Sequence, residues 1–273
     1  MTNNPIDLAR ARVLISNDDG IHAPGLKLLE KVMRRIAREV WVVAPETEQS
    51  AASHSLTLRT PLRIRKLSAR RFAVNGTPTD SVLLGVNTVM KDAPPDVVLS
   101  GINRGGNLGE DVIYSGTVAA AMEGVLLGIR GIALSQVCDD RRLVKWATAE
   151  HWLGEVLNGI VSQPVAKNVV VNVNFPDVIA RAVTGIEITA QGRRKIGGSL
   201  QEGSDPRGDT YYWVGPQRIE DRLKKGTDLE AIDRGAISVS PLCLDLTHRP
   251  SVKALKEIFS ANPGRKNKRR DKA

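Results

Sequence analysis

The feature near the N-terminus that most constrains the fold is an apolar run that ends in two adjacent aspartates. Residues 12–16 (RVLIS) are rich in β-branched side chains, and the turn-forming residues NDDG follow at 17–20. Pro24 opens a pattern in which apolar residues recur at nearly helical spacing, and a second apolar run covers residues 40–44. This order predicts a βαβ unit, whose strands run parallel and are joined by a right-handed crossover.

The same order recurs further along the chain. A third apolar run at residues 96–100 precedes a glycine-rich loop, and a helical pattern begins at about Thr117. The later elements are expected at residues 131–135 (strand), 146–160 (helix), 168–176 (strand), 228–234 (one or two helical turns) and 236–240 (strand). We therefore predict a single doubly wound, Rossmann-like α/β domain with a mostly parallel sheet over residues 1–249.

Two C-terminal segments depart from this pattern. Residues 186–225 contain many turn formers around the aromatic run Tyr211-Tyr212-Trp213, which predicts a projecting β-hairpin arm used in oligomerisation. Residues 250–273 form an extension that ends in PGRKNKRRDKA, a run typical of a disordered basic tail. This tail carries much of the net charge of +9, so binding of nucleic acid is expected only through the tail.

The composition excludes several other classes of protein. No apolar run approaches the roughly 18 residues of a membrane span, and the N-terminus lacks the apolar core of a signal peptide. We therefore expect no membrane association and a cytoplasmic location. Cys138 and Cys243 are far apart, which argues against a disulfide framework and a zinc site, and we expect two buried, reduced thiols.

Asp18 and Asp19 are the first candidates for chemistry, because ligands of such sheets bind beyond the carboxyl ends of the strands. Two carboxylates suit Mg²⁺ or Mn²⁺, and a hydroxyl and an amide from neighbouring loops, Ser50 and Asn103, could complete the ligand set. The structural alternative is that these polar residues only form turns and cap backbone amides.

A second candidate is the segment Ser115-Gly116-Thr117, which directly precedes an alanine-rich helix. Unpaired amides and the positive end of the helix dipole could bind a phosphate there, although Ser115 or Thr117 could also only cap the helix. The glycine spacing matches neither a dinucleotide fingerprint nor a Walker A loop. His22 and His54 lie near these loops, but their spacing assigns no nucleophile, and a metal-activated water is the simpler one.

The segments RVLISNDDGIHAPG, APETEQSAASHSLT, VNGTPTDSV and SGINRGGNLGEDVIYSGTVAAAMEG together closely resemble the SurE family. The resemblance extends through VNVNFP, YYWVG and TDLEAIDRGAISVSPL, over about residues 12–243. It implies a metal-dependent nucleotidase that hydrolyses nucleoside 5′- and 3′-monophosphates, and in some members short polyphosphate. It also implies a homodimer or homotetramer that forms through exchanged C-terminal elements.

The resemblance assigns roles to individual residues. It implies that one divalent ion per subunit, Mg²⁺ or Mn²⁺, is held by Asp18, Asp19, Ser50 and Asn103, with the two aspartates as the catalytic residues. It implies that the substrate phosphate is bound by Asn107, Ser115, Gly116 and Thr117. The chain departs from the family pattern at Ala51, where SurE proteins generally have glycine, and this bears on rate or specificity and removes no ligand.

We therefore expect a phosphomonoesterase that hydrolyses nucleoside monophosphates through a metal-activated water. Two alternatives stay open. One is a broader phosphatase or exopolyphosphatase, and the other is a regulatory protein that binds nucleic acid through its basic tail.

Overall fold

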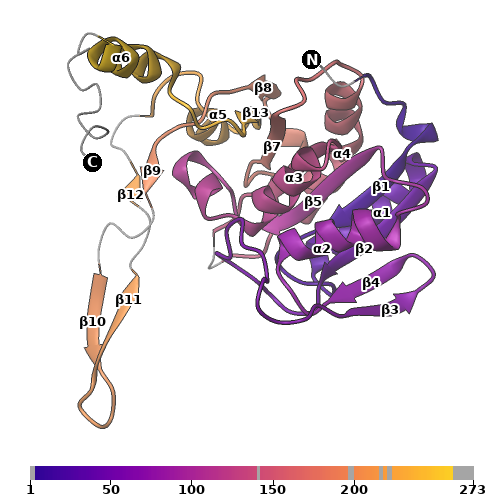
Figure 1. Ribbon diagram of the computed structural model, residues 1–273, viewed down its shortest axis with the longest axis horizontal. Coiled ribbons are helices and arrows are strands. Elements are labelled where there is room, and N and C mark those ends of the chain that lie inside the picture. The colour runs from indigo at the N-terminus through magenta and orange to yellow at the C-terminus, as the bar shows by residue number, and fades with distance from the viewer. Residues whose placement is uncertain (1–3, 140–141, 196–199, 215–217, 220–222, 261–273) are drawn as a thin grey trace, which may run out of the picture.

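A computed structural model describes residues 4–139, 142–195, 200–214, 218–219 and 223–260, and within them one large sheet forms the centre of the molecule (Figure 1). Its strands are, in spatial order, β3 (Ile64–Ser68), β4 (Arg71–Val74), β2 (Glu39–Pro45), β1 (Arg12–Ser16), β5 (Val97–Arg104), β6 (Arg130–Gln136), β7 (Val169–Phe175), β13 (Ile237–Cys243) and β8 (Ile186–Ile188). From β4 to β7 all neighbours are parallel, whereas β3 and β13 run antiparallel to β4 and β7. The predicted mostly parallel α/β fold is confirmed.

Helices cover both faces of this sheet, as a parallel sheet requires. Side chains alternate along β1, so that Val13 and Ile15 pack with α1 (Pro24–Ile36) and α4 (Trp146–Val161), and Leu14 packs with α2 (Pro78–Leu84) and α3 (Gly116–Leu126). The shorter helical elements are η1 (Leu8–Arg10), η2 (Gly85–Val89), η3 (Gly109–Ile113), η4 (Ala180–Ala182) and α5 (Asp228–Asp233). The elements β1, α1 and β2 therefore form the predicted βαβ unit.

The sequence pattern does not predict β3, β4 or α2. On β3 all side chains are partly or fully exposed, because it is an edge strand, so no apolar run marks it. The helix α2 is too short for a clear periodicity, and it is set by a capping box in which Thr77 and Asp80 bond each other's backbone amides. These elements extend the sheet beyond β2 without changing the fold class.

The arm projects away from the body (Figure 1). Its outer part is a hairpin of β10 (Leu200–Ser204) and β11 (Thr210–Val214), and its inner part pairs β9 (Arg194–Lys195) with β12 (Arg218–Ile219). The predicted start at residue 186 is wrong, because residues 186–188 form β8 and pair with β13 in the main sheet. The sequence of a short strand such as β8 does not show which sheet it joins, so the boundary of the arm could not be predicted from it.

The chain after β13 forms one more helix, α6 (Arg249–Ser260), in which none of the residues is buried. The basic tail predicted from the sequence lies outside the described residues. The expectation of two buried thiols is wrong, since Cys138 is partly exposed and Cys243 is exposed where β13 leaves the core. Within the described residues, no helix is long and apolar enough to cross a membrane.

Candidate functional site

The turn after β1 brings Asp18 against the loop that follows β2. Asn17 donates a hydrogen bond from Nδ2 to the carbonyl oxygen of Gly20 at 3.0 Å, which closes the turn. Gly20 has a φ of 93° and lies so close to the chain that an added Cβ would approach the carbonyl carbon of Thr47 to 3.1 Å. The amide of Gln49 donates to the carbonyl oxygen of Asp18 at 2.7 Å. Glycine at position 20 therefore permits the contact between the two loops.

Asp19 is linked in the same way to the C-terminal end of β5, which contains Asn103 and ends at Arg104. Its Oδ2 accepts a hydrogen bond from the amide of Arg104 at 3.3 Å, next to Asn103. The pairing of β5 with β6 shifts register between Ser100 and Asn103. The Asn103 side chain donates from Nδ2 to the carbonyl oxygen of Gly105 at 2.9 Å, so its amide oxygen is left for another partner.

Ser50 lies on the exposed loop after β2, one residue beyond Gln49. Its hydroxyl donates to Oε1 of Glu48 at 2.7 Å, so the oxygen lone pairs are not used in this contact. Burial is the main cause that raises the pKa of Asp18 and of Asp19, and the charge of Glu48 adds a smaller effect in the same direction. The sequence pattern does not single out Glu48, although its position two residues before Ser50 places it at the same strand end.

The two aspartates form an acidic pair in which Asp18 is buried and Asp19 is partly exposed. Burial raises the pKa of Asp18, and the hydrogen bond from Thr117 opposes this effect. Burial, followed by the charge of Asp18, raises the pKa of Asp19 to about 7. No ion pair to Asp18 or Asp19 occurs among the described residues, so no cationic side chain offsets their charge at ion-pair distance.

These features fit a hard divalent cation. Carboxylate, hydroxyl and amide oxygens are the ligands that such ions prefer, and a cation would offset the charge that raises both pKa values. In the part of the chain that the structure describes, no group of three or more His, Cys, Asp and Glu side chains could hold a metal ion. A site at Asp18 and Asp19 therefore depends on Ser50 and Asn103 as additional ligands.

The first turn of α3 lies against Asp18. Thr117 donates its hydroxyl hydrogen bond to Oδ1 of Asp18, and the hydroxyl of Ser115 caps the helix by accepting from the amide of Val118 at 3.0 Å. An added Cβ at Gly116 would lie 2.8 Å from the Cβ of Asp18, so glycine permits this close approach. The structure thus brings Ser115, Gly116 and Thr117 together with Asp18, and the hydroxyl of Thr117 is directed to that carboxylate.

Asn107 is held at the ends of β6 and β7. Its Nδ2 donates to Oγ of Ser135 at 2.8 Å, and its amide donates to Oδ1 of Asn174 at 2.9 Å. Asn172 and Asn174 both donate to its carbonyl oxygen, at 2.8 Å and 3.1 Å. These hydrogen bonds fix the start of the loop that ends at Ser115, and they connect Asn107 to neither Asp18 nor Thr117.

Neither histidine near the site contacts the aspartates by a hydrogen bond. His54 bonds through Nε2 to Oε2 of Glu123 on α3 at 2.9 Å, and His22 is exposed. His54 therefore ties the loop after β2 to the middle of α3.

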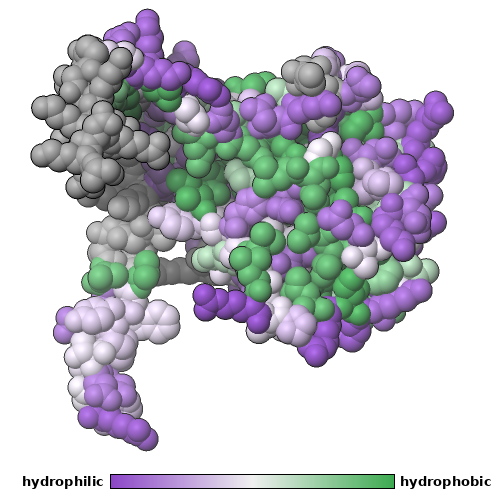
Figure 2. Space-filling model, viewed as in Figure 1, coloured by the Kyte–Doolittle hydropathy of each residue, from purple (hydrophilic) through white to green (hydrophobic). Residues whose placement is uncertain are grey.

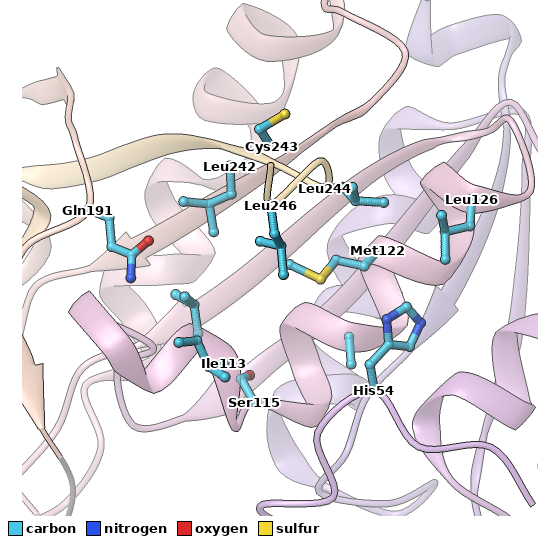
Figure 3. A pocket seen from close by; sticks show the side chains of 12 residues that line it. His54, Ile113, Ser115, Met122, Leu126, Gln191, Leu242, Cys243, Leu244 and Leu246 are labelled. Atoms are coloured by element: carbon cyan, nitrogen blue, oxygen red, sulfur yellow. The ribbon is translucent and has the colours of Figure 1, made fainter. Parts of the chain in front are cut away.

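Two cavities adjoin this region. One, of about 580 Å³, is lined by Asp19, Glu48 and Arg104 together with Trp146 at the start of α4. The other, of about 380 Å³, runs along α3 from Ser115 to Leu126 and is walled by leucines that follow β13 (Figure 3). The walls of the second cavity are mostly apolar. The first cavity is lined by charged side chains that include Asp19, so it is the one that adjoins the acidic pair.

The fold and the site define a class: a doubly wound α/β protein with an acidic pair at the end of β1 and a helix N-terminus beside it. The family model described as Survival protein SurE matches residues 13–198, and the chain belongs to the SurE family. The resemblance inferred from the sequence motifs is therefore confirmed.

Curated relatives and a solved structure agree with this family. A protein of Paramagnetospirillum magneticum named 5′-nucleotidase SurE is 64% identical over 95% of this chain and 100% of its own length. A protein of Rhodospirillum rubrum with the same name is 56% identical over 93% of this chain and 98% of its own length. The crystal structure of the SurE protein from Aquifex aeolicus superposes with a TM-score of 0.81 at 36% identity and covers 91% of this chain and 99% of that chain.

Proposed function

We propose that this protein is a metal-dependent phosphomonoesterase that hydrolyses nucleoside 5′-monophosphates, and 3′-monophosphates as a second substrate class, to nucleoside and phosphate. The names of the relatives support the nucleotidase activity. The observation that carries the proposal is the contact between Asp18 and the first turn of α3, because it sets a cation site beside an anion site.

In this proposal Asp18, Asp19, Ser50 and Asn103 hold one divalent ion, Mg²⁺ or Mn²⁺. When bound, the ion would supply a Lewis acid for the phosphate group and for the attacking water. Asp18 and Asp19 are the catalytic residues, which orient that water. The side chain of Asn107 and the backbone at Ser115, Gly116 and Thr117 bind the phosphate oxygens and stabilise the charge that develops on them.

The shape of the site leaves room for the rest of the substrate. The cavity of about 580 Å³ beside Asp19 is within the usual size range of ligand pockets. Arg104 on its wall is exposed and can contact a polar ligand. No observation favours polyphosphate over a mononucleotide, so the broader phosphatase is not proposed as a second function.

Assembly into a homodimer or homotetramer is part of the proposal. Residues 211–214 on β11 form a run of exposed aromatic and apolar side chains, and contiguous apolar surface of this kind marks interaction sites. Figure 2 shows further apolar surface on the face of the body in view. A second copy of the chain would cover these side chains. The cytoplasmic location and nucleic-acid binding through the tail stay predictions.

The test is phosphate release from nucleoside 5′- and 3′-monophosphates and from short polyphosphate, with Mg²⁺, with Mn²⁺ or with EDTA. We expect hydrolysis of the 5′-monophosphates that EDTA abolishes and added metal restores. Asp19→Asn should lower turnover by more than the roughly 10–100-fold that loss of an outer-shell metal partner causes, whereas the exposed Asp92→Asn should not change it. Undiminished activity in EDTA, or in Asp19→Asn, would contradict the proposal.

A further inference from the structure

The root of the arm, residues 191–194, is bonded to the loop at residues 105–115. Asn107 lies near the start of this loop and Ser115 lies at its end, directly before Gly116 and Thr117 in α3. On one side the loop is held by Ser53, whose amide and hydroxyl donate to the carbonyl oxygens of Tyr114 and Ile113 at 3.2 Å and 2.8 Å. Asn107 is held by β6 and β7, and the middle of the loop, from Gly109 to Asp111, is held by the arm root and by α5.

Arg194 makes the first of these contacts. Its guanidinium donates from Nε to Oδ2 of Asp111 at 3.0 Å and from Nη2 to the same oxygen, and its backbone amide donates to Oε2 of Glu110. Asp111 is buried, and it also accepts from the amide of Leu108 at 3.4 Å. Two N–H groups of one planar guanidinium thus converge on a single oxygen of a buried carboxylate, which limits how far the arm root and the loop can shift against each other.

Asp228, at the start of α5, makes the second contact. Its side chain is 1% exposed, and its two oxygens accept from different segments. Oδ2 accepts from the amide of Gly109 at 2.8 Å, and Oδ1 accepts from the amide of Gly192 at 2.7 Å. One carboxylate therefore joins the loop to the arm root, and Gln191 adds a bond to the carbonyl oxygen of Gly109 at 3.0 Å.

The packing at this junction leaves little freedom. Gly109 has a φ of 55°, and an added Cβ would lie 3.0 Å from the backbone nitrogen of Arg194. A shift of the arm root would therefore move the loop. The contacts that hold Asp18 and Asp19 come from other segments, namely Gln49, Arg104 and Thr117.

We propose that Arg194 and Asp228 are positioning residues for substrate phosphate: they hold the loop 105–115 so that Asn107 and Ser115 keep the spacing that phosphate binding needs. This rests on the proposed function of the same site. The arm is then not only a surface for assembly, because its root belongs to the scaffold of the phosphate site. The proposal assigns these residues a larger effect on phosphate affinity than on metal affinity, because Asp18 and Asp19 are also held by Gln49 and Arg104.

The test compares Arg194→Gln with the conservative Arg194→Lys and with the matched control Arg234→Gln. Arg234 pairs at 2.6 Å with Glu187 on β8 and with Glu230 on α5, so the control removes an ion pair from the same region without touching the loop. We expect Arg194→Gln to raise KM for a nucleoside 5′-monophosphate and the inhibition constant of inorganic phosphate about tenfold or more, since small displacements of binding groups have large effects. The affinity for Mn²⁺ should stay within about twofold, and kcat should change less than KM.

Arg194→Lys should recover part of the phosphate affinity, because it keeps the charge and loses the forked geometry. Asp111→Asn removes the same pair from the other side, so its effect on KM and that of Arg194→Gln should not add in the double variant. Unchanged phosphate inhibition in Arg194→Gln, or an equal loss of Mn²⁺ affinity, would overturn the positioning role. If the wild-type protein hydrolyses no nucleotide, the proposed function fails, and calorimetric binding of inorganic phosphate with Mn²⁺ then still decides the positioning role.

Discussion

Thr117 donates its hydroxyl hydrogen bond to the carboxylate of Asp18, 99 residues earlier in the chain. The first turn of α3 is thereby fixed to the end of β1. This one contact joins the proposed cation site to the proposed phosphate site. The hydroxyl acts on the acidic pair directly, and the backbone of the same turn is left for the phosphate.

We expect Thr117→Val to weaken metal binding roughly tenfold, as loss of an outer-shell partner does. The bond from Thr117 lowers the pKa of Asp18, so its loss raises that pKa further and favours the protonated form, which competes with the metal. Calorimetric titration with Mn²⁺ measures the change. Thr117→Ser keeps the hydroxyl and should bind metal like the wild type, and equal behaviour of the two variants would refute the role of this bond.

In the metal-free protein, the contribution of Asp19 to stability should fall as the pH rises from about 4 to about 7. The pKa of Asp19 is raised from 3.8 to about 7, so the folded state binds this proton more tightly than the unfolded chain does. The contribution is fully present below the unfolded pKa and is lost as the pH rises through the folded pKa. Urea unfolding in EDTA across this range measures it.

Asp19→Asn is the control for this pH dependence, because it removes the titrating group and keeps the shape. The difference in the free energy of unfolding between wild type and variant should change with pH in EDTA, and saturating Mn²⁺ should stabilise the wild type alone. If the free energy of unfolding depended on pH in the same way in both proteins, the pKa of Asp19 would not be raised into this pH range.

Ala51→Gly should stabilise the protein by about 0.5–1 kcal/mol. The change relieves the strain of a left-handed backbone conformation, and this gain exceeds the conformational entropy that glycine loses on folding. Ala51 has a φ of 60°, which is unfavourable for a residue with a Cβ. Ala52→Gly, at a neighbouring position without a positive φ, should instead destabilise it slightly. Thermal unfolding of the two variants decides the matter. The ratio of kcat/KM between nucleotides shows in addition whether the methyl group affects specificity.

Replacing Tyr211, Tyr212 and Trp213 together by Ser should lower the molar mass measured by light scattering. These side chains are exposed on β11, and a partner subunit that covers them would lose apolar contact area. Leu58 and Leu143 are 85% and 93% exposed outside the arm, so their replacement by Ser is the control and should leave the mass unchanged. An unaltered assembly in the arm variant would refute the role of the arm in oligomerisation.

Deletion of residues 264–273 should leave mononucleotide hydrolysis intact and reduce binding to RNA or DNA. A run of charge without apolar residues has no means of packing into a site, and its attraction to polyanions weakens with salt. Hydrolysis and nucleic-acid binding are measured on the same truncated protein at two salt concentrations. Loss of catalysis in a folded truncation would show that the tail acts at the active site.

Local patterns in the sequence account for much of the fold. The bounds of β1 coincide with the apolar run at residues 12–16, and Pro24 and Ser115 begin α1 and α3 as proline and serine do at helix starts. The edge strands β3 and β8 escape such reasoning, because an edge strand buries too few side chains to impose an apolar run.

By itself the sequence determined the βαβ order, the strand ends at which Asp18, Asp19 and Asn103 lie, and the family motifs. These are properties of short segments, which propensity and periodicity specify locally. Only the tertiary structure decided that the Thr117 hydroxyl is directed to Asp18, and that Arg194 and Asp228 hold the loop before Ser115. Those contacts join residues that lie 83 to 119 positions apart, so they depend on how the loops and helices pack and have no signature in any one segment.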